Sequence, residues 1–524
     1  MNALVPLPVM LPMLGAGICL VFGRSARAQR IVSIVVLAAV VVISAVLLWQ
    51  TDANGPHAVD VGGWGQLGIS LVADRLSALL LVVSSIVTLC VLVYSLGQGI
   101  VEFGRDTPLS VYHPTYLVLV AGVSNAFLAG DLFNLYVGFE VLLAASYVLI
   151  TLGGTPARVR AGTTYVIVSL LSSLVFLVAI ALVYAAAGTV NLAALASRMD
   201  ELPDGVSLML QLMLLTAFGI KAAVFPLGAW LPDSYPTAPA PVTAVFAGLL
   251  TKVGVYAMIR VQTLLFPDSP LQGLLLVAAL LTMVIGILGA VAQSDIKRLL
   301  SFTLLSHIGY MMFGLALATT LDSPIALSGA VYYVIHHITV QTTLFLVAGL
   351  IEIRAGSTNL DLIGGLARLS PVLAMLFFIP AMNLAGIPPF SGFLGKVALL
   401  RGGVDDGGWL AYVLVGGSVV TSLLTLYAMA KAWNRAFWQS PPDSAGQAPA
   451  EGALHGNDAI VSDEIDVKSS TMPISMLVPT AALVVFGLVF TVAAGPLFDI
   501  TERSAHELRE RTPYISAVTQ GSDR

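Results

Sequence analysis

The sequence has few charged residues and few cysteines, and both shortages narrow the classes of protein that it can encode. Asp, Glu, Lys and Arg make up 10% of the 524 residues, whereas about 25% is typical of a soluble globular domain. Mean hydropathy is +0.93 and 57% of residues are hydrophobic, which predicts a polytopic membrane protein. Cys19 and Cys90 lie in apolar runs without C-x-x-C spacing, which argues against disulfides, Fe-S clusters and thiolate metal sites. We therefore expect no cofactor and no metal.

Long apolar runs dominate what is present. Windows of about 19 residues predict about fourteen spanning helices. The first run has no basic n-region and no small-residue cleavage site, so we interpret it as a retained helix and not a signal peptide. The predicted spans are 4–22, 31–49, 73–97, 113–130, 132–152, 162–187, 207–227, 239–262, 272–292, 299–319, 325–350, 371–393, 409–437 and 473–495. The fold class expected is an all-α polytopic membrane protein.

Basic residues in the connections predict the orientation. With the N-terminus outside, the inner connections receive most of the Lys and Arg, for example Arg24, Arg158, Lys297 and Arg368, while the outer connections hold few, such as Arg401. Cytoplasmic loops carry this excess in membrane proteins. The pattern predicts a multi-pass protein of the cell membrane with both termini outside.

Two segments are polar. Residues 438–472 are acidic and rich in Pro, Gly and Ser, which predicts a flexible cytoplasmic linker; residues 502–524 are interpreted as a polar, solvated tail. The predicted organisation is 1–112 for three N-terminal helices, 113–262 and 272–437 for two five-helix units, the linker at 438–472, the last helix at 473–495, and the tail at 502–524.

Four ionisable residues interrupt the apolar runs: Glu140, Lys221, Lys252 and Lys396. A charge at the centre of a spanning helix costs roughly 2.5 to 3.5 kcal/mol on insertion scales, so such residues usually face a polar path. We expect ion or proton movement along a path that includes them. The alternatives are a static Glu140–Lys221 pair that fixes helix packing and a Lys252 that extends to an interface.

Two of these lysines accompany proline. Lys221 precedes Pro226, the first of five closely spaced prolines, and Lys396 follows a Gly/Pro interruption. Proline breaks the helical hydrogen-bond ladder, and broken helices at membrane depth line cavities or ion sites. Because the twelfth helix comes five spans after the seventh, an odd number that turns one copy upside down, the pattern predicts two inverted five-helix repeats with discontinuous helices 7 and 12.

Histidines supply candidate relay groups. We hypothesise that a proton passes from Glu140 and Lys221 through Lys252, His307 and His337 to Lys396, since histidine titrates near neutral pH. The histidines could equally be hydrogen-bonded packing residues, and a bis-histidine haem is a weaker alternative. Secondary candidates are Asp233, beside the broken helix, His336 and Gln341.

The motifs around these residues resemble one membrane-protein superfamily. They are KAAVFPLGAWLPDSYPTAPAPVTAVFAGLLTKVGVYAMIR, FNLYVGFEVLLAASYVLI, SDIKRLLSFTLLSHIGYMM, HHITVQTTLFLVAGLIE and LAGIPPFSGFLGK. Together they are similar to the proton-translocating subunits of complex I and the large subunits of Mrp-type cation/proton antiporters, over roughly residues 70 to 435. The resemblance implies fourteen helices and proton-path residues with counterparts at Glu140, Lys221, Lys252, His307, His337 and Lys396.

The last residue of the implied path is a lysine, Lys396, and the sequence shows no long C-terminal lateral helix. On both grounds the chain is most similar to the D-type Mrp subunits. Gln341 stands one turn after His337, where several relatives have lysine, and glutamine cannot carry charge. The resemblance implies other membrane subunits as partners, H+ and Na+ as transported ions, the lipid bilayer as environment, and no nucleic acid.

Three functions remain open at this point. The first is a proton path in a cation/proton antiporter, coupled to Na+ export, without enzymatic activity of its own. The second is a proton-pumping subunit of an NADH:quinone oxidoreductase or membrane-bound hydrogenase. The third is an assembly subunit whose buried charges serve folding and docking alone.

Overall fold

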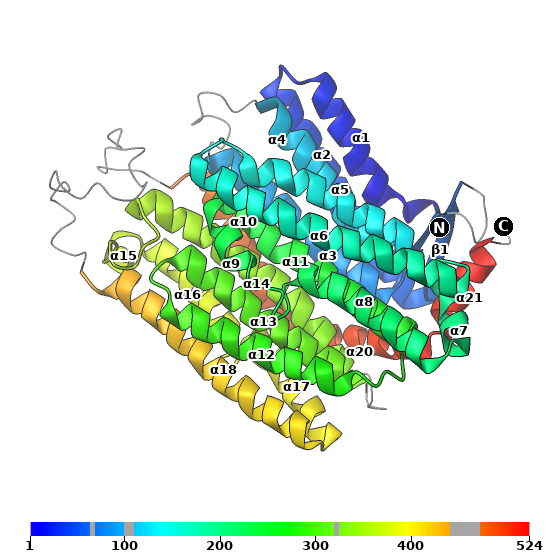
Figure 1. The fold of residues 1–524 in the computed structure, drawn as a ribbon. Coiled ribbons are helices and arrows are strands. Elements are labelled where there is room, and N and C mark those ends of the chain that lie inside the picture. Colours follow the sequence, from blue (N-terminus) through cyan, green and yellow to red (C-terminus); the bar gives the residue numbers. More distant parts are fainter. Residues whose placement is uncertain (1, 63–68, 99–108, 319–323, 441–471, 523–524) are drawn as a thin grey trace.

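A computed structural model describes residues 2–62, 69–98, 109–318, 324–440 and 472–522 (Figure 1). Within these ranges, twelve helices are long and apolar enough to cross a membrane. The prediction of an all-α polytopic membrane protein is confirmed, with one small hairpin as an exception. Each predicted span coincides with a helix or with a broken helix, while the count of fourteen membrane crossings stays a prediction.

Helices follow one another along almost the whole chain. In chain order they are α1 (Leu7–Val21), α2 (Ala26–Asn54), α3 (Arg75–Gln98), α4 (Leu109–Leu128), α5 (Leu132–Thr151), α6 (Pro156–Ala187), α7 (Leu192–Arg198), α8 (Asp204–Ala222), α9 (Leu231–Ser234), α10 (Ala240–Val245), α11 (Thr251–Leu264), α12 (Gln272–Ala292), α13 (Ile296–Ala318), α14 (Ile325–Ala355), α15 (Leu366–Leu369), α16 (Pro371–Ala385), α17 (Ser391–Asp406), α18 (Trp409–Trp433), α19 (Ile474–Val492), α20 (Ala494–Glu510) and α21 (Thr512–Ser522).

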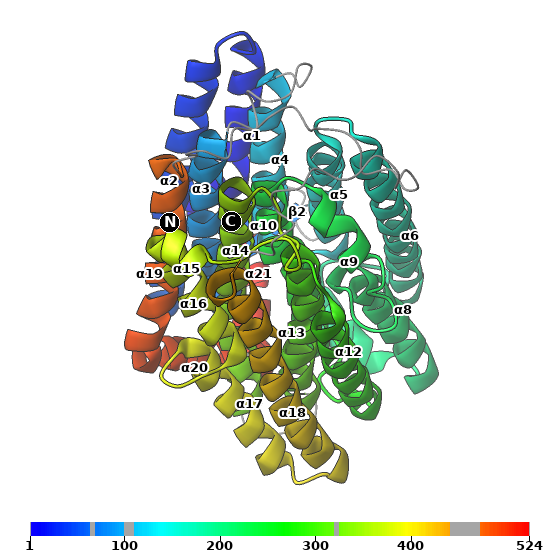
Figure 2. The same ribbon diagram turned by 90° about the vertical axis from the view of Figure 1, so that its left-hand side faces the viewer.

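The core of the bundle is α14. Every residue from Ala326 to Ile351 is buried, and the helix packs against α13, α17, α10, α16, α19 and α3. Figures 1 and 2 show α14 enclosed by other helices on all sides. A helix buried all round is usually apolar all round, so the histidines on α14 require polar partners inside the protein.

A short antiparallel hairpin departs from the all-helical expectation. Strand β1 (His57–Val61) pairs with β2 (Ile69–Ala73), with His57 opposite Ala73. Valine and isoleucine in these segments favour extended backbone. The hairpin lies beside α21 at the end of the bundle that holds both termini (Figure 1).

Two helices end in the middle of a predicted span. Helix α8 stops at Ala222, Ala223 has a left-handed φ of 63°, and the Phe225–Pro226 peptide is cis. Helix α16 stops at Ala385, Gly386 has a φ of 84°, and the Pro388–Pro389 peptide is cis. The backbone is therefore interrupted at both proline clusters, in the same manner. The inverted repeat itself stays a prediction.

The expected polar tail is wrong for residues 502–522. These residues belong to α20 and α21, and Ser504, Ala505, Leu508, Tyr514 and Val518 are buried. The helices are amphipathic, so their many polar residues conceal a face that packs against the bundle. The predicted linker at 438–472 lies almost entirely outside the described residues, because 441–471 are not among them.

Candidate functional site: buried charges across the bundle

Glu140 and Lys221 share a hydroxyl group from a third helix. Ser173 of α6 donates a hydrogen bond to the carboxylate of Glu140 on α5. The ammonium of Lys221, in the last turn of α8, donates to the Ser173 hydroxyl oxygen at 3.1 Å. The predicted pair is therefore brought together through Ser173, which the sequence interpretation missed.

Ser173 belongs to a buried polar face of α6. Ser169, Ser172 and Ser173 are all buried and, at spacings of three and four residues, lie on one side of the helix. Ser172 donates to the backbone carbonyl of Ala217 at 2.9 Å, which holds α6 against α8. This spacing of serines within an apolar run is the signal that would have found the face.

A small cavity adjoins Lys221. Its volume is about 20 Å³, and its lining includes Phe139, Ser169, Trp230 and Leu250. A space of this size holds about one water molecule. The amine of Lys221 also lies 4.9 Å from the centre of the Phe139 ring, so its surroundings combine one charge partner with aromatic faces.

Lys252 is completely buried and its ammonium is held by backbone. It donates to the carbonyl oxygen of Ala247 at 2.6 Å. Ala247 belongs to a π-helical segment, Phe246–Leu250, that joins α10 to α11. Single π-helical turns within helices are frequent at functional sites. Here the turn supplies a carbonyl group to the lysine, which lies five residues further along the chain.

Helices α8 and α11 approach closely between the two lysines. A Cβ atom on Gly254 would lie 2.8 Å from the backbone nitrogen of Ala222, the residue that follows Lys221. Leu250, two residues before Lys252, lines the cavity beside Lys221. Lys221 and Lys252 are therefore close neighbours, because the backbones of their helices are in contact and a residue of the Lys252 segment lines the cavity beside Lys221.

His307 and His337 lie together on α13 and α14. Their ring centres are 5.1 Å apart, and a ring nitrogen of His307 shares a hydrogen bond of 2.7 Å with the Tyr333 hydroxyl. Both rings are completely buried. The charges of Lys252 and Lys396 both act on the two imidazoles, so these four side chains lie in one region of the core.

Lys396 is held by the end of the broken helix α16. Its ammonium donates to the carbonyl oxygens of Leu384 at 3.2 Å and Ala385 at 3.0 Å. The last carbonyls of a helix have no helical partner and carry partial negative charge, so they suit a cation. The amine also lies 4.9 Å from the centre of the Tyr310 ring, and the Tyr310 ring centre is 5.4 Å from that of Tyr333.

His336 faces the same break from the other side. One ring nitrogen shares a 3.0 Å hydrogen bond with Ser391, whose hydroxyl donates to Asn383 at 3.2 Å. Asn383 also accepts from the backbone of Gly392. The arrangement joins α14 to both halves of the broken helix, which favours a role for His336 in packing and fixing the break.

Several buried polar atoms near the histidines lack a hydrogen-bond partner among the described residues. They are Thr251 Oγ1, His307 Nε2, His336 Nε2, both ring nitrogens of His337, and Gln341 Oε1. The amide of Gln341 donates to the carbonyl of Leu300 at 2.7 Å. Unpaired buried polar atoms are costly and call for water or another partner, so this part of the core is chemically suited to internal hydration.

Asp233 lies apart from this buried series. Its side chain is 64% exposed and forms an ion pair of 2.8 Å with Arg298. The structure therefore places it at the surface beside the broken helix, where it joins α9 to α13.

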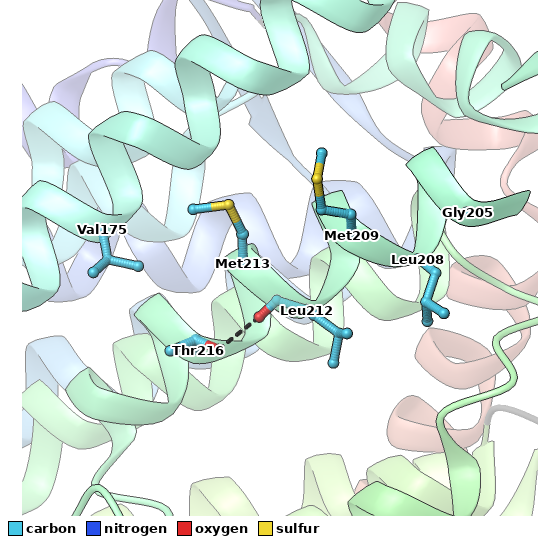
Figure 3. Close-up of a pocket in the computed structure, with 7 residues that line it drawn as sticks. All are labelled: Val175, Gly205, Leu208, Met209, Leu212, Met213 and Thr216. Carbon is cyan, nitrogen blue, oxygen red and sulfur yellow. Dashed lines mark hydrogen bonds between the residues drawn. The ribbon is translucent and has the colours of Figure 1, made fainter. Parts of the chain in front are cut away.

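A larger groove on the outside of the bundle contains none of these groups. It runs between α6 and α8 and is lined by Val175, Met209, Leu212, Met213 and Thr216, among others (Figure 3). The Thr216 hydroxyl donates to the carbonyl of Leu212 in its own helix. The groove is apolar and separate from the series of buried charges.

The fold and the enclosed charges define a polytopic membrane protein with a series of ionisable side chains in its core. Residues 129–425 match the family described as NADH:quinone oxidoreductase/Mrp antiporter, TM. The chain is similar to the D-type subunit of the Na(+)/H(+) antiporter of Alkalihalophilus pseudofirmus, at 37% identity, and to that of Bacillus subtilis, at 34%, each over 99% of both chains.

The chain is also similar to chains in two solved membrane complexes. A chain in the structure of the Mrp complex from Dietzia sp. DQ12-45-1b has a TM-score of 0.88 and 32% identity over 99% of both chains. A chain of the membrane-bound sulfane sulfur reductase, an archaeal respiratory membrane complex, shares the fold with a TM-score of 0.86 and 23% identity, covering 99% of this chain and 100% of that one. This chain belongs to the NADH:quinone oxidoreductase/Mrp antiporter family, in the branch of the D-type antiporter subunits.

Proposed function

We propose that this chain is a subunit of a multisubunit Na+/H+ antiporter of the cell membrane, in which it provides the proton path that is coupled to Na+ export. The observation that carries the proposal is a succession of ionisable groups inside the bundle. It runs from the half-buried Glu140 and the buried Lys221, through Lys252, His307 and His337, to Lys396. The relatives named as subunits of such antiporters support the substrate and the presence of partner subunits.

The path has a carboxylate near Lys221, whereas Lys252 and Lys396 have backbone partners. Lys221 has a carboxylate within reach through Ser173. Among the described residues, the ammonium groups of Lys252 and Lys396 instead donate their hydrogen bonds to carbonyl oxygens. Burial disfavours a charge that lacks a charged partner. A proton on Lys252 or Lys396 is therefore held weakly and is sensitive to the charge of its neighbours.

This sensitivity supplies a mechanism for transfer. When Lys221 is protonated and paired with Glu140, it contributes little positive field to Lys252. When the Glu140 contact opens, the positive charge of Lys221 repels a proton on Lys252, which favours its passage to the imidazole of His337 or His307. Tyr333 joins His307 to the aromatic groups around Lys396, and Lys396 delivers or receives the proton at the far end.

Orientation and coupling are part of the proposal. The positive-inside pattern favours both termini outside. Na+ transport rests on the relatives' names, because within the described ranges no group of three or more His, Cys, Asp or Glu side chains is placed to hold a metal ion.

The test is Na+-dependent proton flux in membrane vesicles that contain the whole complex. Lys396→Ala should lower this flux by at least 10-fold, because it removes one station of the path. Arg401→Ala removes a positive charge from the same helix at a position that is 71% exposed and should leave the flux near that of the wild type. Proton flux that does not respond to Na+ but follows electron transfer in partner subunits would favour the respiratory alternative.

A further inference from the structure

Six charged side chains that the proton path does not use form ion pairs with one another. They come from the end of α2, the start of α3, the end of α11 and the amphipathic helix α20. We call them the terminal cluster: Asp52, Asp74, Arg75, Arg260, Arg503 and Glu507. Three are acidic and three are basic, so the cluster is neutral when all six are ionised.

Exposure falls steadily through the terminal cluster. Arg503, with 45% of its side chain exposed, pairs with Asp52, which is 28% exposed, at 2.7 Å. Asp52 pairs with Arg75, 16% exposed, at 3.0 Å. Arg75 pairs in turn with Glu507, of which 4% is exposed. Linked charges therefore extend from the surface into the protein.

The innermost pair lies on the helix that carries Lys252. Asp74 and Arg260 are paired at 2.5 Å, and their side chains are 1% and 3% exposed. Lys252, Tyr256 and Arg260 follow one another at intervals of four residues on α11, so they lie along one face of it. The guanidinium of Arg260 is 5.5 Å from the Tyr256 ring centre. Arg260 is about 12 Å from Lys252 along the helix axis.

Glu507 is the side chain of the terminal cluster that titrates nearest to neutral pH. Burial raises the pKa of its carboxyl to about 7, and the negative charge of Asp74 adds to this effect, while Arg75 and Arg260 oppose it. Ordinary glutamate titrates near pH 4.3. The other titratable or charged groups that face this site are Asp52, Tyr256, Arg503, Tyr514 and, through Tyr514, Asp131.

We propose that Glu507, which pairs with Arg75 and lies near the Asp74–Arg260 pair, is a site of proton exchange between the aqueous surface and Lys252, in the middle of the path. A proton from water forms an O–H bond on the carboxylate. That bond breaks when the proton moves on along the polar face of α11, and an N–H bond forms on the neutral amine of Lys252; release runs in the opposite sense. The inference rests on the proposed function, because it extends that path to the surface.

A static role for the same residues makes a different prediction. If the terminal cluster only holds α20 and α21 against the bundle, Glu507 stays ionised at neutral pH. Its substitution then lowers transport activity by the same factor at every pH. If it exchanges protons, its carboxyl is protonated in part near pH 7 and the pH profile of transport changes shape. The two roles can therefore be separated by observing the carboxyl group directly.

The experiment is an infrared pH titration of the purified whole complex, in which protonated carboxyl groups have a separate C=O absorption. The wild type should show a carboxyl that titrates with a midpoint of about 7. Glu507→Gln should remove this signal. Glu510→Gln, the same change at an exposed position of α20, should retain it. A wild-type complex with no such signal, or a signal that survives in Glu507→Gln, would overturn the proposal.

A second variant covers the case in which Glu507→Gln does not assemble. Arg75→Gln leaves the acid in place and removes a positive charge beside it, so the midpoint should move to higher pH. An unchanged midpoint in Arg75→Gln would contradict the assignment to Glu507. If neither variant assembles, the wild-type titration still decides, because absence of the signal alone overturns the proposal.

Flux measurements separate this inference from the proposed function. In vesicles, Glu507→Gln should alter the dependence of Na+-driven proton flux on pH at the side of the terminal cluster, while Glu510→Gln should not. A complex without Na+-dependent proton flux would contradict the antiporter function even if the infrared signal is present. Normal flux with the wild-type pH profile in Glu507→Gln would contradict only the exchange site.

Discussion

At the scale of single residues, neutral hydroxyl groups join the ionisable ones. Ser173 connects Glu140 to Lys221, and Tyr333 connects His307 to the aromatic surroundings of Lys396. A hydroxyl both donates and accepts, so it can remain hydrogen-bonded when a neighbour gains or loses a proton. We infer that these two groups keep the spacing of the charged residues while the charge on them changes.

Tyr333 and Tyr332 allow this role to be tested on adjacent positions of α14. Tyr333→Phe should lower Na+-dependent proton flux about 10-fold, equivalent to ~1.4 kcal/mol, because His307 loses its hydrogen-bond partner while the ring remains. Tyr332→Phe removes a hydroxyl that donates to the carbonyl of Phe490 at 3.2 Å and should retain most of the flux. Equal losses in the two variants would show that α14 packing, and not the Tyr333 hydroxyl, is responsible.

Asp131 provides a pH-dependent prediction outside the membrane-spanning helices. It caps α5 by accepting from the backbone nitrogen of Asn134, and burial raises its pKa to about 6 although backbone N–H groups oppose the change. The pKa of Asp131 is higher in the folded protein than in the unfolded chain. Protonated Asp131 therefore stabilises the folded state below about pH 4, and this stabilisation is lost as the pH rises through 6.

Asp131→Asn keeps a capping oxygen and removes the titration. The melting temperature of the variant, measured in detergent, should therefore rise relative to that of the wild type between pH 4 and pH 7. The full effect corresponds to ~3 kcal/mol for a shift of about two pH units. A difference between the two melting temperatures that does not vary with pH would contradict the assignment.

At the scale of helices, the lysines lie where regular helix geometry is interrupted. Lys221 is in the last turn of α8, Lys252 follows a π-helical segment, and Lys396 reaches the end of α16. Each interruption exposes carbonyl groups or ends a helix dipole, and both favour a cation. The same feature in α8 and α16 is consistent with the predicted inverted repeat.

Gly254 tests the close approach of α8 and α11. A methyl group at this position would lie 2.8 Å from the Ala222 nitrogen and 3.0 Å from its Cβ, so Gly254→Ala should destabilise the protein by ~1–3 kcal/mol. Gly273→Ala, on α12, meets nothing within 4 Å and should be neutral or slightly stabilising. Thermal unfolding of the two variants provides the measurement; equal melting temperatures would contradict the close packing.

The interruptions could be predicted from the sequence, and the contacts between helices could not. Proline has a fixed local effect on the backbone, so the positions of the prolines predict the breaks after Lys221 and before Lys396. Ser173 was missed because serine is tolerated in apolar helices without any function. Its importance depends on a carboxylate from α5 and an amine from α8, which are distant in sequence.

In the C-terminal region the sequence interpretation failed to predict packed helices. Its polar residues suggested a solvated tail, because composition was considered without helical periodicity. Glu507 and Tyr514 lie on the packed faces of α20 and α21 and belong to a buried ionic network. Asp233, a secondary candidate beside the broken helix, forms an ion pair with Arg298 at the surface, and its part in the path stays a prediction.

At the scale of the whole molecule, the buried polar groups occupy the helices that are most deeply enclosed. Helices α11, α13 and α14 carry Lys252, His307 and His337, and the surrounding helices shield them from lipid. An interior with a lower dielectric constant than water makes each charge more costly and each interaction between charges stronger. The fold therefore favours transfer between neighbouring stations over permanent charge at any one of them.

The central claim is that Lys252 carries protons between the two halves of the path, and proton flux in vesicles containing the whole complex tests it most directly. Lys252→Gln keeps a hydrogen-bond donor near the Ala247 carbonyl but cannot be protonated. We predict that it abolishes Na+-dependent proton flux, while Arg401→Gln, which removes an exposed positive charge, retains it. Flux near the wild-type value in an assembled Lys252→Gln complex would contradict the account.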